Sequence, residues 1–330
     1  MSHKKTSNTH SAFSIAINSN ASQHKNRMIT TLLISILLSA CGGNSSVLDP
    51  TAPQLAIAQV SQSISHNTGD IGDTIVPPQA IAASQSMAAR ATAVTSLNPD
   101  DYITIESGML PVVISAPHGG ETVIPGVAIR TSGTTVMDWN TYPIAIAIQS
   151  KLYAKTGKRA YLVAAKASRK YVDFNRSADL AYESNLVQPI YDRYYGALNS
   201  AVTAAKLQAP AAALLIDVHG QSSKSSVTYR GTRDGQTANN TIFYTAPNGL
   251  ITTMNALGLS VNPTSAGARD NVNFNGGNIV WVFGKNNIAG INSVQFEFGY
   301  NFRDTDAHVD STASKMCDAI ITHLRSTGAL

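Results

Sequence analysis

Two short apolar runs that each end in a histidine constrain the fold of this chain more than any other feature. Residues 110–121 are LPVVISAPHGGE and residues 211–220 are AAALLIDVHG, so His118 and His219 each follow a stretch of aliphatic residues. Such runs, closed by Pro or Gly, are typical of strands that are covered on both faces. In open α/β sheets, functional groups gather where these strands end. We therefore expect both histidines at one edge of a sheet.

The side chains of His118, Glu121 and His219 form a candidate zinc site. Catalytic zinc is commonly held by three imidazole or carboxylate ligands, which leaves one position for water. Only four histidines lie within residues 100–330, and two of them end apolar runs beside glycine. One ring nitrogen would bind the metal while a second group holds the other nitrogen. Asp217, two residues before His219, is either such a group or a hydrogen-bond acceptor of the core.

The first forty residues have the pattern of a bacterial secretion signal. Basic residues within 25–27 precede residues 28–40 (MITTLLISILLSA), which are apolar and uncharged. This segment is too short to span a bilayer and fits the apolar region of a signal peptide. Residues 38–41 (LSAC) resemble the bacterial lipobox, which implies that Cys41 is lipidated. The alternative is an ordinary secretory signal in which Cys41 has no role.

The lipobox resemblance also implies a location. A lipidated Cys41 would anchor the protein to a membrane of the bacterial cell envelope. Glycine rather than aspartate at position 42 favours the outer membrane. Met28 is an alternative start of translation to Met1, since the leader before it is long and polar.

Composition divides the chain into a signal peptide (1–40), a tether (41–99) and one domain (100–330). The tether is rich in Ser, Ala, Gln and Thr without a sustained period, as expected for a flexible linker. Removing residues 1–40 takes away four of the 24 basic residues and none of the 20 acidic ones. The mature chain therefore has no basic excess, which argues against a nucleic-acid partner. Cys317 is then the only cysteine besides Cys41, so a cysteine-type zinc site is excluded.

Strand and helix patterns alternate along residues 100–330. We expect helices at 138–157, 184–206 and 311–325. The expected strands are residues 102–106, 112–116, 160–165, 212–218, 227–230, 241–245, 278–282 and 293–298. This alternation predicts a three-layer α/β/α fold with a mostly parallel mixed sheet.

Several motifs, taken in order, resemble one enzyme family. They are ISAPHGGETVIP at 114–125, MDWNTY at 137–142, SRKYVDFNR at 168–176, LLIDVHG at 214–220, GGNIVWVFG at 276–284 and VQFEFG at 294–299. Together they are similar to the N-formylglutamate amidohydrolase family and, beyond it, to the zinc carboxypeptidase and aspartoacylase group. The pattern of that group is HxxE, then Arg followed by DxNR, then DxH, then a late strand with a glutamate. The resemblance covers about residues 110–303 and implies a zinc-carboxypeptidase-like fold.

The resemblance implies zinc as cofactor and His118, Glu121 and His219 as its ligands. Asp138 is the alternative to Glu121 as third ligand, or else an acidic residue near a helix N-terminus. Asp173 would orient the first ligand histidine through a hydrogen bond.

The same resemblance implies the roles of the remaining candidates. Arg169 would stabilise the oxyanion, and Asn175 and Arg176 would hold a carboxylate of the substrate. Glu297 would be the general base that takes a proton from a zinc-activated water. The planar fork of arginine matches a carboxylate with two hydrogen bonds.

The expected function is zinc-dependent hydrolysis of an amide bond next to a free carboxylate. The substrate would be a small acidic N-acyl amino acid or a peptide. One alternative is a carboxypeptidase-like peptidase that acts on cell-wall or poly-glutamyl peptides in the envelope. The other is a surface lipoprotein that binds ligands on the same scaffold without catalysis.

Overall fold

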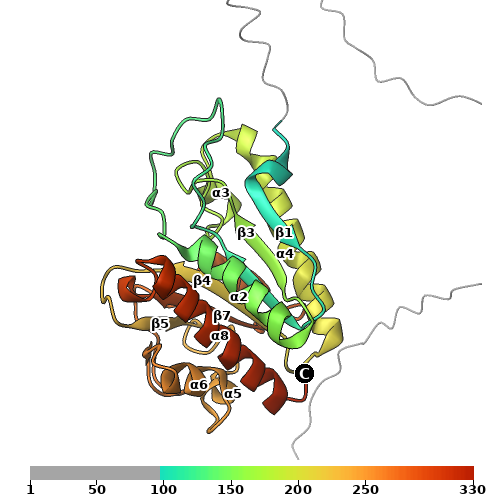
Figure 1. Ribbon diagram of the computed structural model, residues 1–330. Coiled ribbons are helices and arrows are strands. Elements are labelled where there is room, and N and C mark those ends of the chain that lie inside the picture. The colour runs from blue at the N-terminus through green and yellow to red at the C-terminus, as the bar shows by residue number, and fades with distance from the viewer. Residues whose placement is uncertain (1–96) are drawn as a thin grey trace, which may run out of the picture. The chain divides into compact units, whose positions relative to one another are not determined.

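A seven-stranded mixed sheet forms the middle layer of the computed structural model, which describes residues 97–330 (Figure 1). The strand order is β1-β3-β2-β4-β7-β5-β6. The four central strands β3, β2, β4 and β7 run parallel, whereas β1 is antiparallel to β3 and β5 is antiparallel to β7. The predicted α/β fold with a mostly parallel mixed sheet is confirmed.

The chain reverses its direction across the sheet at β2. From β2 (Val112–Ala116) it crosses through α2 (Thr141–Thr156) to β3 (Tyr161–Ala165) on one side. It then returns through α4 (Gln188–Gln208) to β4 (Leu214–Gly220) on the other side of β2. The carboxyl ends of β2 and β4 therefore flank a topological switch point, where α/β proteins bind ligands.

Alternate residues of the central strands pack into two separate cores. Val112 and Ile114 face the layer that contains α2 and α8 (Asp306–Ser326). Val113 and Leu215 face the layer that contains α4 and α7 (Asn278–Phe283). Because side chains alternate along a strand, Asp217 and His219 continue the α4 side of the sheet beyond Leu215. This face is thus apolar at its beginning and polar at its carboxyl end.

The remaining elements are short. The other strands are β1 (Ile103–Glu106), β5 (Thr228–Gly231), β6 (Val261–Asn262) and β7 (Asn292–Phe298). The other α-helices are α3 (Ala178–Ala181), α5 (Asn240–Tyr244) and α6 (Leu250–Ala256). Single 3₁₀ turns lie at η1 (Pro99–Tyr102), η2 (Asn185–Val187) and η3 (Tyr300–Phe302).

Two predicted strands, at 241–245 and 278–282, are wrong, because these segments form the helices α5 and α7. Short apolar runs do not distinguish strand from buried helix by periodicity. The side chain of Asn239 caps α5, and glycines at 277 and 284 bound α7. The expected helix at 138–157 begins later, at Thr141, which leaves Asp138 in the preceding loop.

No helix within residues 97–330 is both long and apolar enough to cross a bilayer. The predicted signal peptide, the lipidation site Cys41 and most of the predicted tether lie outside the described residues.

His323 is a buried titratable group in the last turns of α8, apart from the strand ends that carry His118 and His219. It is 1% exposed, its ring meets Phe243 edge-on, and its Nδ1 has no hydrogen-bond partner among the described residues. Burial lowers the pKa of His323 to about 4, from an ordinary value of 6.5. Between these values the unfolded chain binds a proton that the folded chain excludes, so the free energy of unfolding decreases as the pH falls.

Between pH 7 and pH 4.5, we expect the free energy of unfolding of His323→Phe to fall by roughly 2 to 3 kcal/mol less than that of the unmodified protein. Urea unfolding of both proteins at the two pH values measures this difference. Above pH 7.5 the two unfolding free energies should change in parallel with pH. An equal loss in both proteins at pH 4.5 would contradict the assignment.

Candidate metal centre

The two histidines of the sequence motifs meet at the switch point. His118 follows β2 by two residues, and His219 is the last but one residue of β4. Both are 2% exposed. Their Nδ1 atoms lie 3.2 Å apart, with the rings at 76° to each other. The structure therefore brings together two imidazoles that are 101 residues apart in the sequence.

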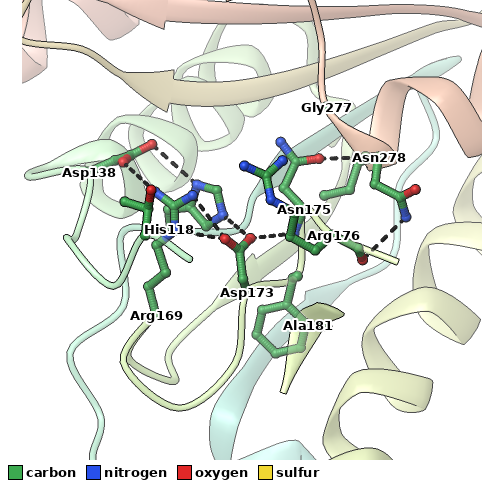
Figure 2. A network of polar contacts seen from close by, with 12 residues as sticks. His118, Asp138, Arg169, Asp173, Asn175, Arg176, Ala181, Gly277 and Asn278 are labelled. Atoms are coloured by element: carbon green, nitrogen blue, oxygen red, sulfur yellow. Dashed lines mark hydrogen bonds and ion pairs between the residues drawn. The ribbon is translucent and has the colours of Figure 1, made fainter. Parts of the chain in front are cut away.

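A carboxylate holds the outer nitrogen of each ring. His118 Nε2 lies 2.6 Å from Asp173 Oδ1 (Figure 2). His219 Nε2 lies 2.9 Å from Asp217 Oδ2. When a neutral ring donates its Nε2 proton to the acid behind it, its Nδ1 keeps the lone pair that a metal ion binds. Both Nδ1 atoms consequently present lone pairs to each other, which is favourable only with a positive charge between them.

The third atom at this point belongs to Asp138. Its Oδ2 lies 3.1 Å from His219 Nδ1 and 3.4 Å from His118 Nδ1. The Asp138 backbone N–H donates to the carbonyl of His118 at 3.1 Å. Gly119 allows the loop after His118 to lie against the start of α2, because a Cβ at position 119 would lie 2.3 Å from the backbone nitrogen of Tyr142.

These three atoms fit a tetrahedral zinc ion. Ligand atoms about 2.0 to 2.1 Å from such an ion lie about 3.3 to 3.4 Å from one another. The three observed separations span 3.1 to 3.4 Å. Within the described chain, His118, Asp138 and His219 are the one group of three side chains whose ligand atoms meet this closely. Two imidazole nitrogens and one carboxylate oxygen are also ligands that zinc accepts.

The charges around the histidines favour a divalent cation. Six buried ionisable groups line the pocket or contact the histidine rings. Four are acids, namely Asp138, Asp173, Asp217 and Glu297, and two are arginines, Arg169 and Arg303. Burial alone would raise the pKa of Asp138, but His118 and His219 hold it below its ordinary value. The buried acids outnumber the buried arginines, so the charge balance of the site favours a bound cation.

Glu121 lies outside this group, so its expected role as third ligand is wrong. Gly120 and Thr122 form bridges to Ser168 and Ala167, and Glu121 between them is exposed. It lines a separate pocket of about 240 Å³ behind the glycines. The alternative residue, Asp138, supplies the carboxylate instead.

Arg169 contacts Asp173, the acid behind His118, and Asp138. Its Nε and Nη2 donate to Asp173 Oδ2 at 3.0 and 2.9 Å, and its Nη1 lies 3.4 Å from Asp138 Oδ1 (Figure 2). Although burial opposes it, His118 and Arg169 keep the pKa of Asp173 below its ordinary value. Asp173 thus lies between His118 and Arg169, and Arg169 is mostly occupied by protein acceptors.

The side-chain amide of Asn175 is also occupied by the protein. Its Oδ1 accepts from the backbone of Ile279 at 2.9 Å, and its Nδ2 donates to Gln295 Oε1 at 3.2 Å. A Cβ at Gly277 would lie 2.1 Å from Asn175 Nδ2, so this contact requires the glycine. Asn175 therefore fixes the wall of the site rather than offering free donors to a ligand.

Arg176, the next residue, presents a free guanidinium group. It is exposed and lines the site pocket, and its side chain makes no hydrogen bond or ion pair within residues 97–330. The pocket has a volume of about 640 Å³ and also exposes His118, His219 and Asp138. Of the two residues expected to hold a substrate carboxylate, Arg176 has the free donors.

Glu297 lies beside His219 on the neighbouring strand. The β4–β7 register pairs the two residues, and Glu297 Oε1 is 4.0 Å from His219 Nδ1. Gln295 Nε2 donates to Glu297 Oε1 at 2.7 Å. Burial raises the pKa of Glu297 to about 7, with Asp138 acting in the same direction and His219 opposing. A carboxyl group with such a pKa can accept and return a proton near neutral pH.

Two site residues escaped the sequence analysis. Gln295 lies on the same strand face as Glu297, so the alternation of β7 is the signal that would have revealed it. Arg303 follows η3 and is 4% exposed, where it donates to three backbone carbonyls of the pocket wall. No local sequence pattern indicates that position.

Comparisons with known proteins give structural likeness only. No protein-family profile and no curated protein sequence matches the chain. The N-formylglutamate amidohydrolase of Ralstonia eutropha JMP134 is 17% identical with a TM-score of 0.47, over 69% of this chain and 97% of that one. A bacteriophage poly-gamma-glutamate hydrolase is 13% identical with a TM-score of 0.34, over 74% of this chain and 96% of that one.

We expect Asp138→Asn to weaken zinc binding by more than about 100-fold, because it removes the anionic ligand of the group. The matched variant Glu121→Gln should bind zinc within about twofold of the unmodified protein, since Glu121 is remote from the ligand atoms. Competition with a chromogenic chelator measures both affinities. Loss of zinc in Glu121→Gln with retention in Asp138→Asn would restore Glu121 as the ligand.

Proposed function

We propose that this protein is a zinc-dependent hydrolase that cleaves an amide bond next to a free carboxylate. The observation that carries the proposal is the meeting of two Nδ1 atoms and Asp138 Oδ2, with both outer ring nitrogens held by acids. The ordered motifs resembling the N-formylglutamate amidohydrolase family support the same chemistry. The three ligands and the acids behind the rings come from four separate segments, at 118, 138, 173 and 217–219. Supporting hydrogen bonds of this kind are typical of metal sites and not of chance surface clusters.

A zinc ion bound there would polarise the substrate carbonyl and lower the pKa of a water molecule to about 7. The protein residues supply the proton transfers. Glu297 accepts a proton from the water as its oxygen adds to the carbonyl carbon. When the carbon–nitrogen bond breaks, Glu297 returns that proton to the leaving nitrogen. The products are a carboxylic acid and an amine.

Gln295 keeps the Glu297 carboxylate in position for this exchange. Its Oε1 accepts from the backbone N–H of Gly277 at 2.8 Å and from Asn175 Nδ2 at 3.2 Å. The amide orientation is therefore fixed, and its Nε2 must point toward Glu297.

Arg176 gives the substrate its orientation. A free guanidinium at the rim of the pocket matches a carboxylate with two parallel hydrogen bonds. An N-acyl amino acid or a C-terminal peptide bond carries such a carboxylate next to the amide. The adjacent acidic groups of the site repel other anionic positions of the ligand, so the carboxylate is directed to Arg176.

We expect Glu297→Gln to retain stoichiometric zinc while kcat falls by about 10² to 10⁴, because the amide cannot accept the proton. Metal analysis and hydrolysis of N-acyl-L-glutamates, before and after a chelator, provide the measurements. A protein that holds no zinc, or one that hydrolyses these compounds equally well after complete metal removal, would refute the proposed function.

Arg176→Ala should raise KM by about tenfold to 100-fold for substrates with a free carboxylate, since it removes a charge-assisted hydrogen-bond pair. Amidated substrates, which lack the charge, should be affected far less. Arg325→Ala, which alters an exposed arginine in the last turn of α8, is the matched control and should leave KM unchanged. Equal KM changes for both substrate types would contradict the role of Arg176.

We also propose that the protein is a lipoprotein of the bacterial envelope. The support is the apolar segment at 28–40 followed by LSAC, with Cys41 as the lipidation site. We expect Cys41→Ser to move the protein from the membrane fraction to the aqueous fraction after cell lysis. Unchanged fractionation of this variant would contradict the anchor.

A further inference from the structure

Two aromatic side chains stand half-exposed on one wall of the site pocket. Trp139 is 47% exposed and Tyr300 is 48% exposed, and both line the pocket together with Val136. The rest of the lining is largely polar or charged, including the ligand group and Arg176. Apolar groups at the mouth of such a pocket indicate a surface that binds part of a ligand.

The wall that carries these aromatics is fixed by Arg303. Its Nη1 donates to the carbonyl of Trp139 at 2.7 Å and its Nη2 to the carbonyl of Gln221 at 3.0 Å. Its Cζ lies 5.8 Å from the centre of the Tyr300 ring. The side chain of Asn140 in turn donates to the carbonyl of Arg303 at 2.7 Å. The backbone at Trp139 is thus held in place where this residue lines the pocket.

The aromatic wall and Arg176 lie at different ends of the site. Figure 2 shows Asp138 on one side of His118 and Arg176 on the other. Arg303 binds the carbonyls of Trp139 and Gln221, and the N–H of Gly220, the residue before Gln221, donates to Asp138 Oδ2 at 3.2 Å, so the aromatic wall adjoins Asp138. A substrate whose carboxylate reaches Arg176 therefore extends its other end, the acyl group, toward Trp139 and Tyr300.

We propose that Trp139 and Tyr300 bind an aromatic acyl group, an inference that rests on the proposed function. The substrate class is then N-acyl amino acids or short peptides with an aromatic group on the acyl side of the scissile amide. The pocket volume of about 640 Å³ lies well within the range that encloses ligands of this size. Offset or edge-on contacts between rings supply affinity that a small acyl group cannot reproduce.

Calorimetric binding to zinc-loaded Glu297→Gln protein, in which we expect turnover to be slow, tests this inference. We expect N-benzoyl-L-glutamate to bind at least tenfold more tightly than N-acetyl-L-glutamate. Adding Trp139→Ala should reduce this ratio to less than threefold, whereas Trp139→Phe should keep most of it. Trp281→Ala, which removes the only other tryptophan of the chain, lies outside the pocket lining and should leave the ratio unchanged.

Equal affinity for the two compounds, a ratio that survives Trp139→Ala, or binding of neither compound would overturn the inference. A different result would refute the proposed function. The unmodified protein would then hold no zinc or hydrolyse neither compound, whatever the ratio of the two dissociation constants. Circular dichroism of each variant confirms that a changed ratio comes from a folded protein.

Discussion

The electrostatics of this sheet edge depend on two imidazole nitrogens that face each other at 3.2 Å. An acid behind each ring makes the inner nitrogen a lone-pair donor. Asp138 adds a third electron-rich atom at the same point. In a buried setting such an arrangement is costly unless a positive charge occupies the space between the donors. The acids on the outer nitrogens also make the rings better metal ligands. The same feature that costs folding energy therefore creates affinity for a divalent cation.

The fold explains how distant segments reach this point. Crossovers through α2 and α4 place β3 and β4 on the two sides of β2. The loops after β2 and β3 deliver His118 and Asp173, and the carboxyl end of β4 carries His219. The parallel register of β4 with β7 sets Glu297 beside His219 without any loop contribution. A rigid sheet thus holds one ligand and the proposed base, while Asp138 comes from the loop before α2. The loop contributions depend on close approaches at Gly119 and Gly277.

The sequence predicts the central sheet and the histidine pair because both rest on strong local signals. Long aliphatic runs closed by glycine or proline specify buried strands, and the order of the motifs orients them. The third ligand was not predictable in the same way, because the choice between Glu121 and Asp138 depends on how two loops pack. The bridges of Gly120 and Thr122 to residues 167–168 turn Glu121 to the solvent, and no local pattern encodes them. The helices at α5 and α7 were missed since a five-residue apolar run fits either element. Arg303 was missed because its backbone acceptors become neighbours only in the folded chain.

We propose that His118, Asp138 and His219 hold one zinc ion through the two Nδ1 atoms and one carboxylate oxygen. Diffraction from crystals of the zinc-loaded protein, measured on both sides of the zinc absorption edge, locates the metal. We expect a single strong anomalous peak about 2.0 to 2.1 Å from both Nδ1 atoms and from an Asp138 oxygen. A peak at Glu121, or no peak between the two rings, would contradict it.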